Sequence, residues 1–124
     1  MFNKACTFRD WRKANEIMLS VIPYRMKRLG RRVSNFDEEI WAEKRPRFVA
    51  KGLYAKFSQN EKFAKKLLAT DDKLLGEASA RDKIWGIGLE MEHPDVLNPY
   101  RWTGENLLGK SLMMTRHQLQ QALH

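Results

Sequence analysis

Two tryptophans followed by glycines most constrain how this chain of 124 residues can fold. Trp85 is followed by Gly86 and Gly88, and a second Trp-x-Gly occurs at Trp102 and Gly104. Because glycine has no Cβ, the backbone beside each indole can approach a flat ligand closely. The pattern predicts either a pocket for a planar group such as a nucleobase or a buried tryptophan with glycine turns.

Two acidic residues precede the first of these motifs. Asp82 lies three residues before Trp85, and Glu77 and Asp82 flank Ser79. A carboxylate at this position could polarise or protonate a group that is held on the indole face. We therefore take Asp82 and Glu77 as candidate catalytic acids. Asp82 could equally cap the turn that contains Lys83.

Positive charge is concentrated in the N-terminal half. Residues 1–66 hold 17 Lys and Arg against 7 Asp and Glu, whereas residues 67–124 hold 6 against 8. This asymmetry favours an anionic ligand or partner, either a phosphorylated small molecule, a dinucleotide or a nucleic acid, although a solvated basic face explains it as well. Lys27 with Arg31, and Arg28 with Arg32, lie four residues apart and so predict one cationic edge around Gly30. Lys27, Arg31 and Arg32 are the candidates for binding phosphate there.

Aromatic and amide side chains supply further candidates for ligand binding. Trp85 and Trp41 could each stack on a planar base, and Gly86 would let that base approach. Asn106 could read a base edge or a ribose hydroxyl, or cap the final helix.

The composition excludes several classes of protein. No apolar run approaches the ~20 residues of a membrane span, and no secretory signal is visible. Cys6 is the only cysteine, so an internal disulfide is excluded and a reducing cytoplasmic location is expected. We expect no metal and no cofactor, because the sequence has neither a Cys/His cluster at ligand spacing nor a nucleotide-binding glycine motif.

The periodicity predicts a single domain over residues 1–124 of mainly α (α+β) class with a small β element. The short strand is expected at 74–78. Pro46 predicts either a kink or two helices after the acidic start at 37–39. Helices are expected over 2–8, 11–19 (capped by Asp10), 23–29 (with Gly30 just past its end), 60–68 (capped by Asn60) and 105–123.

An ordered series of short motifs resembles the NADAR family. The series comprises AKFSQN at 55–60, LLAT at 67–70, the segment LLGEASARDKIWGIGL at 74–89 and WTGENLLGKSLM at 102–113. Upstream, Lys4-Ala5, Gly30-Arg31, Phe36 and Trp41 fit the order and spacing of the family. The resemblance implies an N-glycosidase that acts on riboflavin-pathway intermediates or on ADP-ribose conjugates. The expected partner is thus a phosphorylated nucleotide-like molecule or an ADP-ribosylated base.

The same resemblance implies a catalytic role for Lys4. In the family, a lysine at this position works with a glutamate about two turns earlier, and that glutamate would precede Met1. On this comparison we expect impaired catalysis and apolar surface near Phe2, Phe8 and Trp11 that a second subunit could cover. The alternatives are a non-catalytic module that binds ADP-ribose or a nucleotide, and a small basic nucleic-acid-binding protein.

Overall fold

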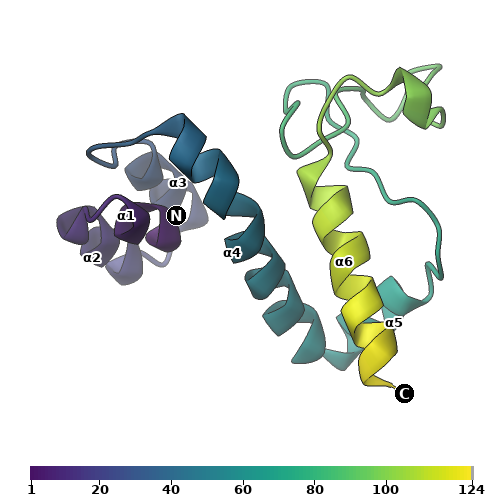
Figure 1. Cartoon of the computed structure of the whole chain (residues 1–124), viewed down its shortest axis with the longest axis horizontal. Coiled ribbons are helices and arrows are strands. Elements are labelled where there is room, and N and C mark those ends of the chain that lie inside the picture. The colour runs from purple at the N-terminus through teal and green to yellow at the C-terminus, as the bar shows by residue number, and fades with distance from the viewer. Residues whose placement is uncertain (124) are drawn as a thin grey trace. The chain divides into compact units, whose positions relative to one another are not determined.

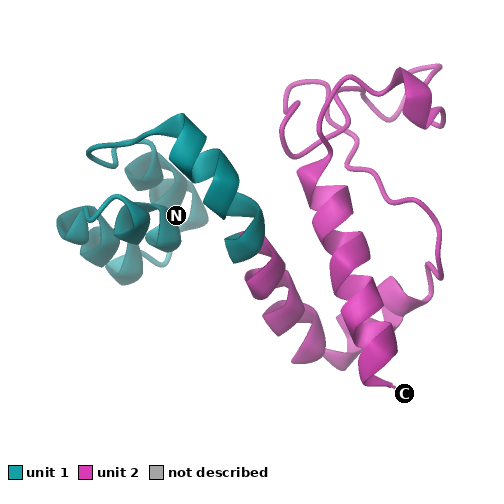
Figure 2. Cartoon of the chain, viewed as in Figure 1, with its two compact units in different colours: residues 1–48 teal, residues 49–124 magenta. Residues whose placement is uncertain are grey.

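The structure is a computed structural model that describes residues 1–123, and its regular elements are all helices. They are α1 (Phe2–Thr7), α2 (Trp11–Leu19), α3 (Pro23–Gly30), α4 (Glu38–Ser58), α5 (Glu61–Leu68), the 3-10 helix η1 (Pro99–Arg101) and α6 (Leu107–Ala122) (Figure 1). The chain forms two compact units, residues 1–48 and 49–124, whose boundary falls inside α4 (Figure 2). No helix of residues 1–123 has both the length and the apolar composition to cross a membrane.

In the first unit, α1, α2 and α3 pack on one another around a small core. Two apolar positions of α2, Ala14 and Ile17, are buried because they are three residues apart on one helix face. Trp11, Ala14, Ile17 and Met18 recur at helical spacing in the sequence and so predict a wider apolar face, but Trp11 and Met18 are more than 60% exposed. The other buried core residues of this unit are Ala5, Phe8 and Val33.

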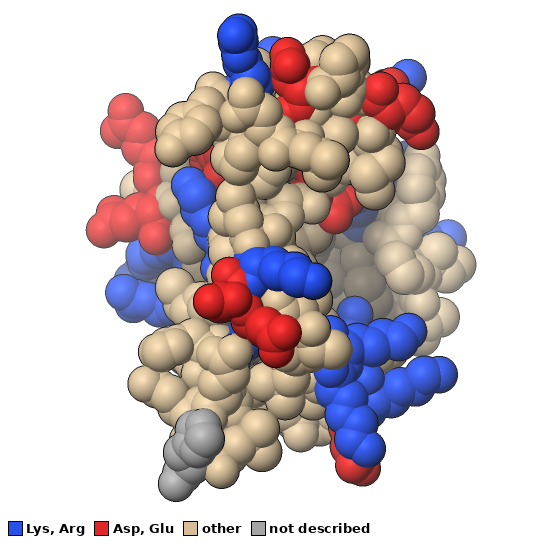
Figure 3. Space-filling view, turned by 90° about the vertical axis from the view of Figure 1, so that its right-hand side faces the viewer, with Lys and Arg blue, Asp and Glu red and all other residues tan. Residues whose placement is uncertain are grey.

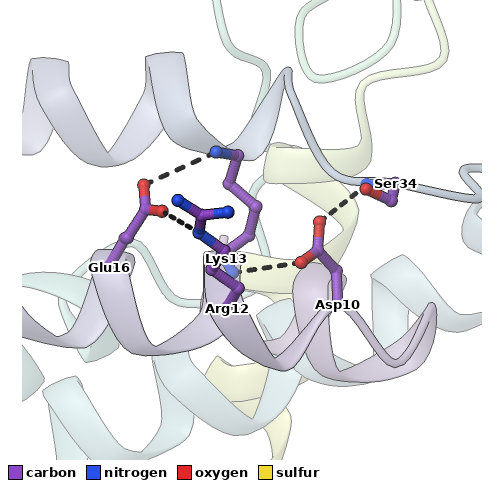
Figure 4. Close-up of polar contacts among 5 residues, drawn as sticks. All are labelled: Asp10, Arg12, Lys13, Glu16 and Ser34. Atoms are coloured by element: carbon purple, nitrogen blue, oxygen red, sulfur yellow. Dashed lines mark hydrogen bonds and ion pairs between the residues drawn. The ribbon is translucent and has the colours of Figure 1, made fainter.

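Asp10 connects two segments of the first unit. One carboxylate oxygen accepts a hydrogen bond from the backbone N–H of Lys13 (3.1 Å) and so caps α2 as predicted, while the other accepts from the N–H of Ser34 (2.8 Å) (Figure 4). On the next turn of α2, Glu16 pairs with both Arg12 and Lys13. The hydrogen bonds from Ser34 and Lys13 lower the pKa of Asp10 below its ordinary value of 3.8.

This cap predicts an acid-dependent stability. A lowered carboxyl pKa stabilises the folded state above the unfolded pKa, and the contribution is lost as the pH falls through the folded pKa. Asp10→Asn should therefore lower the melting temperature at neutral pH, and the difference from wild type should shrink between about pH 5 and about pH 2. Circular dichroism melts at a series of pH values measure this, and a pH-independent difference would contradict it.

Helix α4 begins after the acidic segment, as expected, and continues past Pro46. Asp37 caps its start, because its carboxylate accepts from the N–H groups of Glu39 (2.9 Å) and Ile40 (3.3 Å). Pro46 lies inside a single helix of 21 residues, so the alternative of two separate helices is wrong.

In the second unit, α5 packs against α6. Asn60 caps α5 as predicted, by accepting from the N–H of Phe63 (3.4 Å). The buried Arg116 of α6 donates from Nη1 to the Thr70 hydroxyl (2.9 Å) and to the Lys73 carbonyl (2.8 Å). These bonds fix the turn after α5 against the last helix.

The predicted small β element is wrong, since residues 1–123 contain no strand. The segment 74–78 has no strand partner. The side chain of Asn106 takes that place: its Nδ2 donates to the Leu75 carbonyl (2.9 Å) and its Oδ1 accepts from the Glu77 N–H (3.1 Å). One side-chain amide thus satisfies the groups that a neighbouring strand would otherwise bind.

Candidate functional site

The glycines of the tryptophan motifs bring backbone segments of the second unit together. A Cβ on Gly86 would lie 2.7 Å from the Asp82 carbonyl oxygen and 3.0 Å from that of Glu77. A Cβ on Gly104 would meet the Gly86 carbonyl oxygen and the Gly88 nitrogen. The space beside these glycines is therefore filled by other loop segments of the protein itself.

The same loop caps the start of α6. The backbone N–H groups of Asn106, Leu107 and Leu108 donate to the carbonyls of Gly86 (2.9 Å), Ile84 (3.0 Å) and Trp85 (3.1 Å). The first N–H groups of a helix are often free to bind phosphate. Here the residues around Trp85 already bind them, so these groups hold the loop in place.

Asn106 is the centre of this arrangement. It is buried and adopts a left-handed backbone conformation (φ 53°), which asparagine tolerates better than most residues. Both polar atoms of its side-chain amide are hydrogen-bonded to the backbone of residues 75–77. The side chain therefore does not cap α6, since it accepts no hydrogen bond from the first N–H groups of that helix. This geometry gives Asn106 a positioning role, and reading of a base edge stays a prediction.

The two candidate acids have different surroundings. Asp82 Oδ1 accepts from the N–H groups of Ile84 (3.1 Å) and Trp85 (2.9 Å), so the carboxylate caps the turn and is oriented by it. Glu77 is exposed, and its backbone bonds to Asn106 and Ile87. Trp85 is half-buried next to Asp82, whereas Trp102 is fixed by donating from Nε1 to the Val96 carbonyl (2.8 Å).

A matched pair of glycine substitutions tests the close packing of the loop. Gly104→Ala should destabilise the second unit by about 1–3 kcal/mol, because the added methyl meets backbone that cannot move aside. Gly52→Ala, where a Cβ meets nothing within 4 Å in α4, should stabilise it by about 0.5–1 kcal/mol. Urea unfolding measures both, and equal effects would refute the packing argument.

A second group of candidate residues lies in the first unit, around Lys4 of α1. The side chain is half-buried, and its Nζ lies 4.4 Å from the centre of the Phe36 ring. Phe36 in turn packs edge-on against Phe8 at 5.2 Å. We call Lys4, Phe36, Glu38, Arg31 and Arg45 the lysine group.

Burial is the main cause of a lowered pKa for Lys4, since it removes water from the ammonium. Glu38 opposes this effect, and the positive charges of Arg45 and Arg31 add to it. Glu38 also pairs with the buried Arg45, with 3.6 Å between Oε1 and Nη1. A lysine with a lowered pKa supplies a neutral amine at lower pH, as nucleophilic lysines require.

The predicted cationic edge is divided between two surfaces. Arg31 acts on Lys4, whereas Arg32 lines a separate groove between α2 and α3 together with Arg28. Lys27 and Arg31 are exposed. Trp41 is half-buried against the core and stacks on Phe48, with ring centres 5.9 Å apart.

Sequence reasoning missed Phe36 and Glu38 as parts of the lysine group. Glu38 was interpreted only as an acidic residue at the start of a helix, and no spacing rule connects position 38 with position 4. The available indication was the resemblance itself, whose series includes both Lys4 and Phe36. Among residues 1–123, no three His, Cys, Asp or Glu side chains are arranged to hold a metal ion.

The charges around Lys4 predict opposite effects of two substitutions. Glu38→Gln should lower the pKa of Lys4 further, and Arg31→Gln should raise it toward the ordinary 10.5. The pKa can be measured by NMR titration of carbon-13-labelled lysine. A wild-type midpoint at or above 10.5, or shifts of the same sign in both variants, would contradict this electrostatic account.

Comparison with known proteins shows that the chain is similar to one family over nearly its whole length. The NADAR domain family matches residues 1–120. The chain is 43% identical to an N-glycosidase of Acanthamoeba polyphaga mimivirus, over 98% of this chain and 71% of that protein. It is 37% identical to the protein irg-1 of Caenorhabditis elegans (96% of this chain, 57% of that one) and 30% identical to a riboflavin biosynthesis protein of Vibrio vulnificus (97% and 30%). The chain belongs to the NADAR family.

Proposed function

We propose that this protein is an N-glycosidase that cleaves the bond between a ribosyl carbon and a base nitrogen. The observation that carries the proposal is the half-buried amine of Lys4, which lies over Phe36 with a lowered pKa. The family supports it, since a relative at 43% identity is named an N-glycosidase.

Lys4 would act as the nucleophile. In its neutral form, Nζ attacks C1 of the ribose, and the bond from C1 to the base nitrogen breaks. The bonding electrons stay on the leaving nitrogen, which takes up a proton. The resulting ribosyl-lysine opens to a Schiff base, and water then releases the sugar and restores the amine. Glu38 would offset the positive charge of Lys4 during these steps, whereas the positive charge of Arg45 would favour the neutral amine.

The substrate we propose is phosphorylated and nucleotide-like. Lys27 and Arg31 are exposed cations of the first unit, and Arg31 acts electrostatically on Lys4, so a phosphate at Arg31 would lie near the reacting amine. A riboflavin-pathway intermediate and an ADP-ribosyl conjugate both carry such a phosphate. The name of the Vibrio vulnificus relative favours the first, at only 30% identity.

The residues of the second unit have proposed roles that can be tested separately. Trp85 would stack on a planar ligand, with Gly86 fixing the turn beside it. Asp82, oriented by its two backbone hydrogen bonds, would hold or protonate a group on that ligand, and the exposed Glu77 would assist. In the first unit, Trp41 would contribute to binding through its half-buried ring.

Substitution of Lys4 tests the proposed chemistry. Lys4→Arg keeps the positive charge over Phe36 but removes an amine that can lose its proton, so release of base should fall by at least about 100-fold. The assay follows free base from a ribosylamino-pyrimidine phosphate and from ADP-ribosylated guanine. Lys44→Arg, at an exposed position of α4, is the control and should behave as wild type. Full activity of Lys4→Arg would exclude the amine as nucleophile.

A nucleotide-binding module without catalysis is the second candidate. The geometry of Asp82 favours this alternative. One oxygen of its carboxylate already accepts two backbone hydrogen bonds, so that oxygen is engaged in holding the turn and not in acid–base chemistry. This alternative predicts calorimetric binding of ADP-ribose without turnover by the wild type.

Under either function, Trp85→Ala should weaken binding by about 1–3 kcal/mol. Unchanged affinity of a folded variant would remove Trp85 from the site.

A further inference from the structure

A groove of about 630 Å³ lies between α2 and α3 in the first unit. Neither Lys4 nor any other member of the lysine group lines it. One side is formed by Arg25, Arg28 and Arg32. They follow one another at intervals of three and four residues, so they extend over roughly 10 Å along one side of α3 and the turn after it.

These three arginines have no acidic partner among residues 1–123, since none of the ion pairs there includes them. The acidic residue of the groove, Glu16, is already paired with Arg12 and Lys13 (Figure 4). The groove thus presents three cations whose charge the unit itself does not balance.

Three further side chains of the groove are largely apolar and exposed. Leu19 is 77% exposed, Ile22 50% and Tyr24 69%, although all three side chains line the same groove. Aromatic residues and arginine together are the composition of protein interfaces. Tyr24 is the single aromatic side chain among the residues that line the groove, and its neighbours Leu19 and Ile22 have no π face for a nucleobase, which favours a protein over a nucleic-acid strand as the occupant.

The loop before η1 in the second unit has the opposite character. Glu90, Glu92 and Asp95 lie within six residues and make no ion pair among residues 1–123. Met91 is 70% exposed and Leu97 92% exposed. Acidic side chains are visible near the upper edge of the face that Figure 3 draws.

This loop is already ordered before any partner binds. Successive turns are closed by hydrogen bonds from the N–H of His93 to the Glu90 carbonyl (3.1 Å), from Val96 to His93 (3.1 Å) and from Asn98 to Asp95 (2.9 Å). A segment that is ordered when free loses little conformational entropy on docking.

We propose that the acidic loop of residues 90–97 of one copy docks into the α2–α3 groove of a second copy. Three carboxylates then meet three guanidinium groups. A carboxylate and a guanidinium group can form two parallel hydrogen bonds, which strengthens each ion pair. Met91 and Leu97 cover Leu19, Ile22 and Tyr24. Each copy carries both surfaces, so two copies can exchange loops or several can associate head to tail.

Charge reversal provides a decisive test. One variant combines Arg25→Glu with Arg28→Glu, and the other combines Glu90→Lys with Glu92→Lys. In each variant alone, groove and loop carry the same charge, so sedimentation equilibrium should show association weakened by at least about tenfold. In an equimolar mixture, each acidic surface faces a basic one, and association should return. Wild-type association should also weaken as salt is added.

Lys62→Glu with Lys66→Glu is the matched control. It changes the net charge by the same amount at exposed positions of α5 and should associate as wild type does. A monomeric wild type at submillimolar concentration, or two single variants whose mixture stays monomeric, would overturn the proposal. So would a wild type whose groove binds single-stranded DNA in place of a second copy.

Discussion

The side-chain amide of Asn106 is the interaction on which the second unit depends. It binds the 75–77 backbone through both of its polar atoms, and its own backbone N–H binds Gly86. The start of α6, the segment after α5 and the Trp85 loop therefore meet at one residue. Residues 1–123 contain no strand that could support the loop, so hydrogen bonds, glycine packing and the buried side chain of Ile87 hold it.

In the first unit the corresponding constraint is electrostatic. A small helical core partly buries Lys4 and leaves it under the influence of two arginines, which is unfavourable for an ammonium ion. Glu38 and the face of the Phe36 ring offset part of this cost. Arrangements that disfavour the charged form of a lysine are characteristic of nucleophilic amines, and the chemistry proposed above follows from this one cost.

The sequence predicted most of the helices because their caps and periodicity are local. Asp10, Asn60 and Pro23 mark helix starts at the predicted residues. The strand at 74–78 was wrong, because the partner of that segment is the side chain of a residue about thirty positions away, which no local pattern reveals. The glycines were recognised as sites of close approach, but the approaching group is backbone. Lys4 was identified through family resemblance, whereas its neighbours Phe36 and Glu38 depend on tertiary packing.

Trapping of the covalent intermediate tests the central claim most directly. The protein is incubated with a ribosylamino-pyrimidine phosphate in the presence of borohydride, which reduces a Schiff base to a stable secondary amine, and is then digested and analysed by mass spectrometry. The account predicts a ribosyl phosphate adduct on Lys4 and none in Lys4→Arg. Turnover of the substrate without any adduct, or an adduct confined to another lysine, would contradict it.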